Sequence, residues 1–154
     1  MARTTRAILQ LMVLAMTVAA PALFAADLKV HVDDTTVARG EKAGAAAFVA
    51  RLDQPVPQGA VLTLDWETVD GTAVAKTDFV PGKGSVKVTS TDPKVKVVAV
   101  VPLMTGKDAA ARCAFSIKVK ASITGAHTVT VDNAEGKATA TIFKDTTRVA
   151  PRAN

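Results

Sequence analysis

The sequence predicts an all-β protein, built as an antiparallel β-sandwich of about seven strands. Short runs in which apolar and polar residues alternate are separated by turn-forming residues about every ten positions. No segment of the mature chain shows a helical period. Valine and alanine carry most of the apolar content, while aromatic residues make up only 4% and Tyr is absent. Such a composition favours strands on a modest core, and 154 residues are typical of one domain.

The N-terminal stretch predicts a secretory signal peptide. Arg3 and Arg6 precede an apolar run over 7–20, and small residues follow Pro21. Cleavage after Ala25 is preferred to cleavage one residue later, which would put a bulky Phe at the upstream specificity position. An uncleaved anchor is the alternative, but the run is short for a membrane span. We therefore expect a signal peptide over 1–25, a domain over 26–146, a disordered basic tail over 147–154, and a secreted or periplasmic location.

The first three strands are expected where the alternation is regular. Residues 28–32 form the first strand, 35–40 a short extended piece with a turn, and 46–52 the second strand. After a connection rich in Pro and Gly comes the third strand, 62–67, whose inward set ends in Trp66. A ring of that size is expected to anchor the core.

The later strands follow a crossing over residues 68–84. They are expected at 85–88, 94–101, 114–121, 127–131 and 138–143. In the second of these, one phase holds Val95, Val97, Ala99 and Val101, which we expect to face inward. The alternate positions on the opposite face also become apolar toward the end of this strand, so we expect that end to be covered on both faces.

The crossing contains Thr68-Val69-Asp70-Gly71-Thr72-Ala73, followed by Thr77-Asp78-Phe79. This pattern resembles the signature of Calx-beta domains. Weaker matches are 34–40, the strand 48–52 and the closing Thr141-Ile142-Phe143-Lys144-Asp145. The resemblance covers most of the mature chain and implies an immunoglobulin-like Greek-key sandwich. From the residues themselves, Asp70-Gly71 suits a tight exit from a strand with a positive φ at the glycine. Lys76 replaces the usual Gly, so that turn must be remodelled or strained.

The resemblance also implies a calcium site at one end of the sandwich, which this chain has largely lost. The position of an early acidic ligand is Arg39, and an acidic connection has become 105–113, with Asp108 its remaining acid. Asp78 and Asp145 survive as residual metal ligands, and Lys144 precedes the latter. Calcium needs 6–8 oxygen ligands. No cofactor is therefore expected, and calcium is disfavoured.

We predict that Arg39 and Lys144 replace the ion by pairing with Asp78 and Asp145. An opposite charge within ion-pair range removes the need for a bound cation. In the alternative, all four side chains are exposed and unpaired, since surface ion pairs contribute little.

The remaining candidate residues do not form a catalytic set. The single Cys113 excludes an internal disulfide and paired-thiolate zinc sites; it is a free or intermolecular thiol, and a buried inert one is favoured. Arg112 beside it could lower its pKa, but strand neighbours point to opposite faces. His31 and Asp33 share a strand face without a serine in the sequence pattern to complete a triad.

The sequence favours a non-enzymatic binding or structural module. Signal cleavage would lower the formal net charge from +5 to +3, and the dispersed basic residues exclude nucleic acid as a partner. The expected partner is another envelope or extracellular protein or a surface polymer. A weak calcium-binding adhesion module is the first alternative, and a periplasmic enzyme accessory or inhibitor the second.

Overall fold

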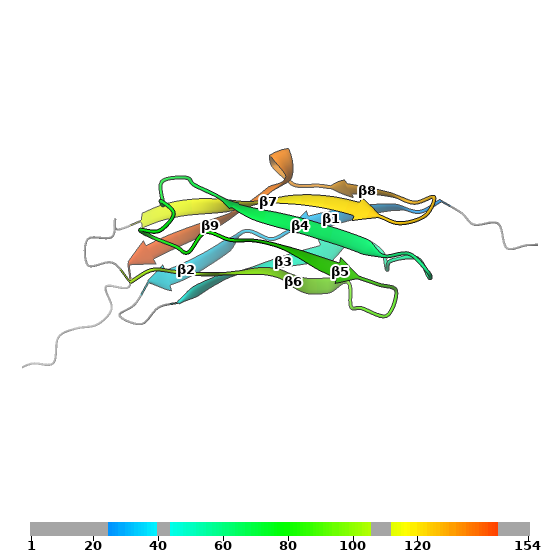
Figure 1. Cartoon of the computed structure of the whole chain (residues 1–154), viewed down its shortest axis with the longest axis horizontal. Helices are drawn as coiled ribbons and strands as arrows, with labels where there is room; N and C mark the ends of the chain where they lie inside the picture. The colour runs from blue at the N-terminus through cyan, green and yellow to red at the C-terminus, as the bar shows by residue number, and fades with distance from the viewer. Residues whose placement is uncertain (1–24, 40–43, 106–111, 145–154) are drawn as a thin grey trace, which may run out of the picture.

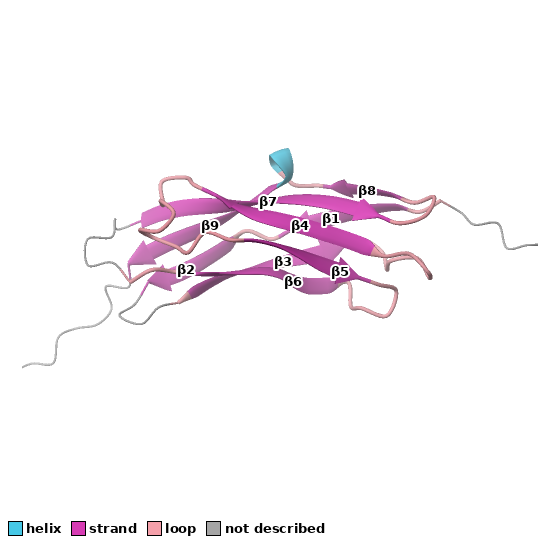
Figure 2. Ribbon diagram, in the orientation of Figure 1, coloured by secondary structure: helices cyan, strands magenta, loops and turns pink. Residues whose placement is uncertain are grey.

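Two stacked β-sheets make up the protein. The computed structural model describes residues 25–39, 44–105 and 112–144. One sheet has the order β6-β3-β1-β8 and the other β2-β9-β7-β4-β5 (Figures 1 and 2). The strands are β1 (Asp27–Val32), β2 (Thr35–Arg39), β3 (Ala45–Leu52), β4 (Leu62–Val69), β5 (Lys83–Val88), β6 (Val95–Pro102), β7 (Arg112–Ile123), β8 (Thr128–Val131) and β9 (Lys137–Lys144). A short 3₁₀ turn, η1 (Ala134–Gly136), precedes β9.

The predicted sandwich is confirmed, with two additions. The extended piece expected over 35–40 contributes the strand β2, and the pairs β1–β8 and β2–β9 run parallel while the other pairs are antiparallel. The chain leaves one sheet after β1 and joins the other as β2, and it makes the same change of sheet between β8 and β9. Apart from Ala25, the expected signal peptide and the basic tail over 147–154 lie outside the described residues. No helix in the described ranges is long and apolar enough to cross a membrane.

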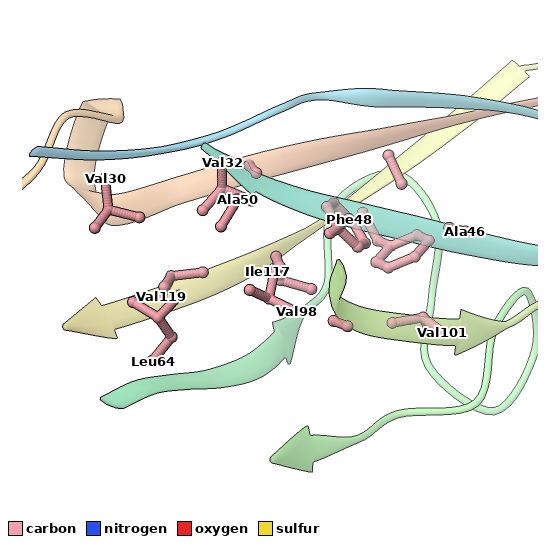
Figure 3. Close-up of a cluster of buried hydrophobic side chains, with 14 of the residues drawn as sticks. Val30, Val32, Ala46, Phe48, Ala50, Leu64, Val98, Val101, Ile117 and Val119 are labelled. Carbon is pink, nitrogen blue, oxygen red and sulfur yellow. The ribbon is translucent and has the colours of Figure 1, made fainter. Parts of the chain in front are cut away.

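The core lies between the inner faces of the two sheets, as Figure 3 shows for part of it. In β3 every second residue from Ala46 to Leu52 is buried, which is the period-two pattern of a strand with one covered face. Phe48 and Phe115 meet edge to face, with ring centroids 6.0 Å apart. Phe79, from the crossing between β4 and β5, stacks on Phe115 at 4.2 Å. This aromatic group fixes the crossing against the core.

The inward phase expected for β6 was wrong at its start. Val95 and Val97 are 47% and 51% exposed, whereas Val98, Ala99 and Val101 are buried. The register of β6 against β3 shifts between Phe48 and Val49, so two residues of one strand face one residue of the other. Such a β-bulge reverses the alternation. Val100 is 54% exposed, so the expected cover on both faces is also absent at that residue.

Trp66 packs against the core at its margin and is only partly buried. It lies opposite Val119 on β7 and Gly84 on β5. A Cβ added to Gly84 would lie 2.9 Å from the indole nitrogen, too close for any other residue without a shift of the ring. Trp66 is therefore a core residue as expected, but it closes the edge of the sandwich and does not sit at its centre.

Candidate functional site

The Asp-Gly-Thr segment after β4 ties the crossing to strand β7. The Asp70 carboxylate accepts a hydrogen bond from the Ala75 amide at 3.1 Å. The Thr72 hydroxyl accepts one from the Ala114 amide at 2.8 Å, so it binds a neighbouring strand and not local backbone. Gly71 does not have a positive φ, and the expectation for it was wrong. Glycine is needed there because a Cβ would lie 2.4 Å from the Ala114 carbonyl oxygen.

The second half of the crossing presents Asp78. Its amide donates to the Val74 carbonyl at 2.9 Å, and its Oδ2 accepts from the Val74 amide at 2.9 Å. Lys76 has a φ of +67°, which confirms that this turn is strained with a lysine. The adjoining Phe79 is fully buried in the aromatic group. Asp78 is thus held from both sides, with one carboxylate oxygen left to face β2.

Arg39, the last residue of β2, fills the space in front of Asp78. Its Nη1 donates to Asp78 Oδ1 at 2.9 Å, and its Nη2 donates to the Asp78 carbonyl oxygen at 3.2 Å. The side chains are only 5% and 13% exposed. Within the described ranges the buried Arg39 Nε has no hydrogen-bond partner. The guanidinium therefore binds both the side chain and the backbone of Asp78.

Of the other two residues expected at this end, the structure describes Lys144 but not Asp145. Lys144 pairs with Arg39 in the parallel ladder of β2 and β9, so both lie at the same end of the sandwich (Figure 1). Lys144 is exposed, and no salt bridge is formed by it within the described ranges. Asp145 and Asp108 lie outside the described residues. In the part of the chain that the structure describes, no three His, Cys, Asp or Glu side chains gather as a metal site.

Cys113 lies beneath the arginine. Its sulfur is 3.9 Å from Arg39 Nη2, and the residue is 3% exposed. Burial, together with the Asp78 charge, raises the pKa of this thiol, although Arg39 opposes the shift. The thiol is protonated at neutral pH and is a poor nucleophile. The expected buried thiol is confirmed, but the cation beside it is Arg39 from another strand and not Arg112.

His31 and Asp33 line a groove of about 920 Å³ between β1, η1 and β9. Asp33 accepts a hydrogen bond from Arg51 Nε at 2.7 Å. Ser116 lines the same groove, but its hydroxyl lies 3.3 Å from the Thr139 hydroxyl. Among the described residues no hydrogen bond joins His31 to either side chain. The serine that sequence spacing missed therefore does not complete a catalytic relay.

The fold has relatives among solved structures. No protein-family model matches the chain, and no curated protein matches it. The apo-form Calx CBD1 domain aligns over 77% of this chain and 97% of that chain, at 21% identity and a TM-score of 0.57. The Calx CBD2 domain aligns over 77% and 88%, at 10% identity and a TM-score of 0.59.

A third relative is a longer chain. The structure of CBD12 from CALX1.2 matches over 76% of this chain but 45% of its own length, at 20% identity and a TM-score of 0.60. The likeness in all three cases is one of architecture. It confirms the resemblance drawn from the crossing motif: this chain folds as a Calx-beta-like β-sandwich.

Proposed function

We propose that this protein is an exported, non-enzymatic binding or structural module in which an arginine–aspartate pair replaces a calcium ion at one end of the sandwich. The observation that carries the proposal is the contact of Arg39 with Asp78 at 2.9 Å, in a nearly buried setting. A carboxylate that already faces a guanidinium has its charge balanced. Its second oxygen also accepts a backbone N–H, which leaves few lone pairs for a metal ion that needs 6–8 oxygens.

Calcium titration tests this proposal. We expect neither binding heat in isothermal titration calorimetry nor a change in melting temperature when calcium replaces a chelator. Micromolar affinity would contradict the proposal and favour the alternative, a weak calcium-binding adhesion module. One of the related structures is described as the calcium binding domain CBD12 of CALX1.1. In the event of binding, Asp78→Asn identifies the site: affinity lost in this variant assigns the ion to the Arg39 end.

Export is supported by the N-terminal pattern of the sequence. A protein expressed with its own leader is expected to begin at Ala26, with residues 1–25 removed, and to appear in the periplasm or the medium. Mass spectrometry of the purified protein gives the new N-terminus directly. A product that retains residues 1–25 would refute the cleavage site.

The partner proposed for the module is another envelope or extracellular protein or a surface polymer, with no nucleic acid and no membrane span after cleavage. Strands at sheet edges, such as β6 and β5, present backbone groups on which β-sandwiches bind extended segments. Pull-down from an envelope fraction tests this role. Recovery of one enzyme in fixed proportion would favour the other alternative, an accessory or inhibitor of that enzyme.

A further inference from the structure

The start of β1 is held by a histidine from the connection between β7 and β8. The Ala26 amide donates to His127 Nδ1 at 3.1 Å, in a partly buried position. One residue further on, the Thr128 amide donates to the Ala26 carbonyl at 3.0 Å. The Thr128 hydroxyl also donates to Asp27 Oδ1 at 2.9 Å. The parallel pairing of β1 with β8 begins with Asp27 opposite Thr128, so the imidazole is the outermost link of this pairing.

This hydrogen bond requires a neutral imidazole. A backbone nitrogen here can only donate, so Nδ1 of His127 must be the acceptor and the ring proton must sit on Nε2. Protonation places a second proton on Nδ1, and two donors then face each other. Histidine is the side chain that changes charge in mildly acidic solution.

The segments that would open, the start of β1 and the start of β8, are weakly anchored. β8 has four residues, and none of them is fully buried. On β1, Asp27 is exposed, whereas Leu28 is completely buried. Segments with few buried apolar contacts open locally at low cost. Opening is therefore confined to Ala26, Asp27 and the start of β8, because the fully buried Leu28 holds the rest of β1 in the core.

We propose that His127 is a pH-sensitive latch for the start of β1, closed when the imidazole is neutral and open when it is protonated. The charged groups on the elements that pack around this end are Asp27 and Lys29 on β1, Asp53, which accepts from the Lys29 amide, and Arg112, Lys118 and Lys120 on β7. The Asp27 carboxylate accepts from Thr128, and the Asp53 carboxylate accepts from the Lys29 and Gln54 amides. Among the described residues neither carboxylate accepts a hydrogen bond from the Ala26 amide, so His127 Nδ1 is the acceptor that protonation removes.

Signal cleavage would increase the effect of His127 protonation on this end of β1. If the exported chain begins at Ala26, as proposed above, the group that donates to His127 is the α-amino group itself. A protonated imidazole would then face a second positive charge as well as a second donor. The latch operates with or without this cleavage, because the amide of an uncleaved chain makes the same hydrogen bond.

Amide hydrogen exchange of the purified exported protein, followed by NMR, tests the latch. The Thr128 amide reports on the latched end of β8, and the Asp132 amide, which donates to the Val30 carbonyl at 2.8 Å, reports on the far end of the same pairing. Exchange is expressed as a protection factor, which removes the intrinsic pH dependence. From about pH 7.5 to about pH 5.0 we expect Thr128 protection to fall about fivefold or more while Asp132 protection stays constant.

Two variants make the result specific. His127→Asn places a carbonyl oxygen near the position of Nδ1 but does not titrate, so the pH dependence at Thr128 should vanish. His31→Asn removes the other of the two histidines and should leave that dependence intact. A constant wild-type protection factor, or an equal fall in His127→Asn, would overturn the proposal. Retained Asp132 protection shows in each variant that the sandwich is folded.

Discussion

The buried pair of Arg39 and Asp78 can be separated in two ways with different costs. Asp78→Ala leaves the guanidinium, whose side chain is 5% exposed, without its counter-charge and removes the acceptor of the Val74 amide. We expect a loss of about 3–5 kcal/mol in the free energy of unfolding, the usual cost of breaking a buried ion pair. Arg39→Met keeps most of the side-chain volume, and Asp78 retains its backbone donor. The expected loss is about 1.5–3 kcal/mol, the contribution of hydrogen bonds to a charged group.

The double variant measures the coupling between the two side chains. Each single change leaves one uncompensated charge, and this penalty disappears when both partners are gone. The double variant should therefore lose about 1.5–3 kcal/mol less than the sum of the single changes. Additivity within about 0.5 kcal/mol would refute the coupling, and with it the argument that the arginine substitutes for a bound cation.

Urea unfolding is the assay, with the fluorescence of the single Trp66 and far-UV circular dichroism as two probes. Equal slopes against urea for all variants are needed before the free energies are compared. Asp33 and Arg51 provide the matched control. Their nitrogen–oxygen distance is 2.7 Å, shorter than that of the buried pair, but the arginine side chain is 58% exposed. Solvent screening should limit the cost of breaking that pair to less than about 1 kcal/mol.

Three further predictions follow from single residues. Lys76→Gly should stabilise the protein by about 1 kcal/mol in urea unfolding, since glycine tolerates the φ of +67°; Lys76→Ala keeps the Cβ, and an equal gain there would contradict this explanation. Hydrogen bonds from Lys96 and Thr89 lower the pKa of Asp92 from 3.8 to about 2. The stabilising contribution of the Asp92 carboxylate is therefore complete above about pH 4 and is lost as the pH falls toward 2. Asp92→Asn should flatten the curve of unfolding free energy against pH in that range, and an unchanged curve would argue against the contribution. Burial raises the pKa of Cys113, so Ellman's reagent at about pH 8 should react slowly with the native protein and rapidly in urea; rapid reaction of the native protein would show an accessible thiol.

The strands that were easiest to anticipate have one covered face. In β7, which was expected over 114–121, Phe115, Ile117 and Val119 occupy alternate positions and all three are buried. Their alternation reflects the pleat of a strand, a property of adjacent residues. β6 departs from its alternation because the bulge depends on how it pairs with β3, which no pattern within β6 records.

At the candidate site, too, some features could be anticipated from the sequence and others depend on contacts between strands. The motif around Asp70 indicated the crossing, and the resemblance that it carries implied that Asp78 and Arg39 share one end of the sandwich. The contact of Arg39 with Cys113 was not anticipated, because these residues lie on different strands and no spacing relates them. Gly71 was assigned to the right turn for the wrong reason, since the close approach of Ala114 is visible only in three dimensions.

Residue order alone was sufficient for the class of fold and the inner faces of most strands, because both depend on local composition and period. The stacking of the two sheets decided the rest. It determined that Arg39 is buried against Asp78, that β6 exposes its first valines, and that the imidazole of His127 receives the Ala26 amide across a hundred residues of chain. Such contacts form between groups distant in sequence, and their geometry is fixed only when the packed core brings the strands into register.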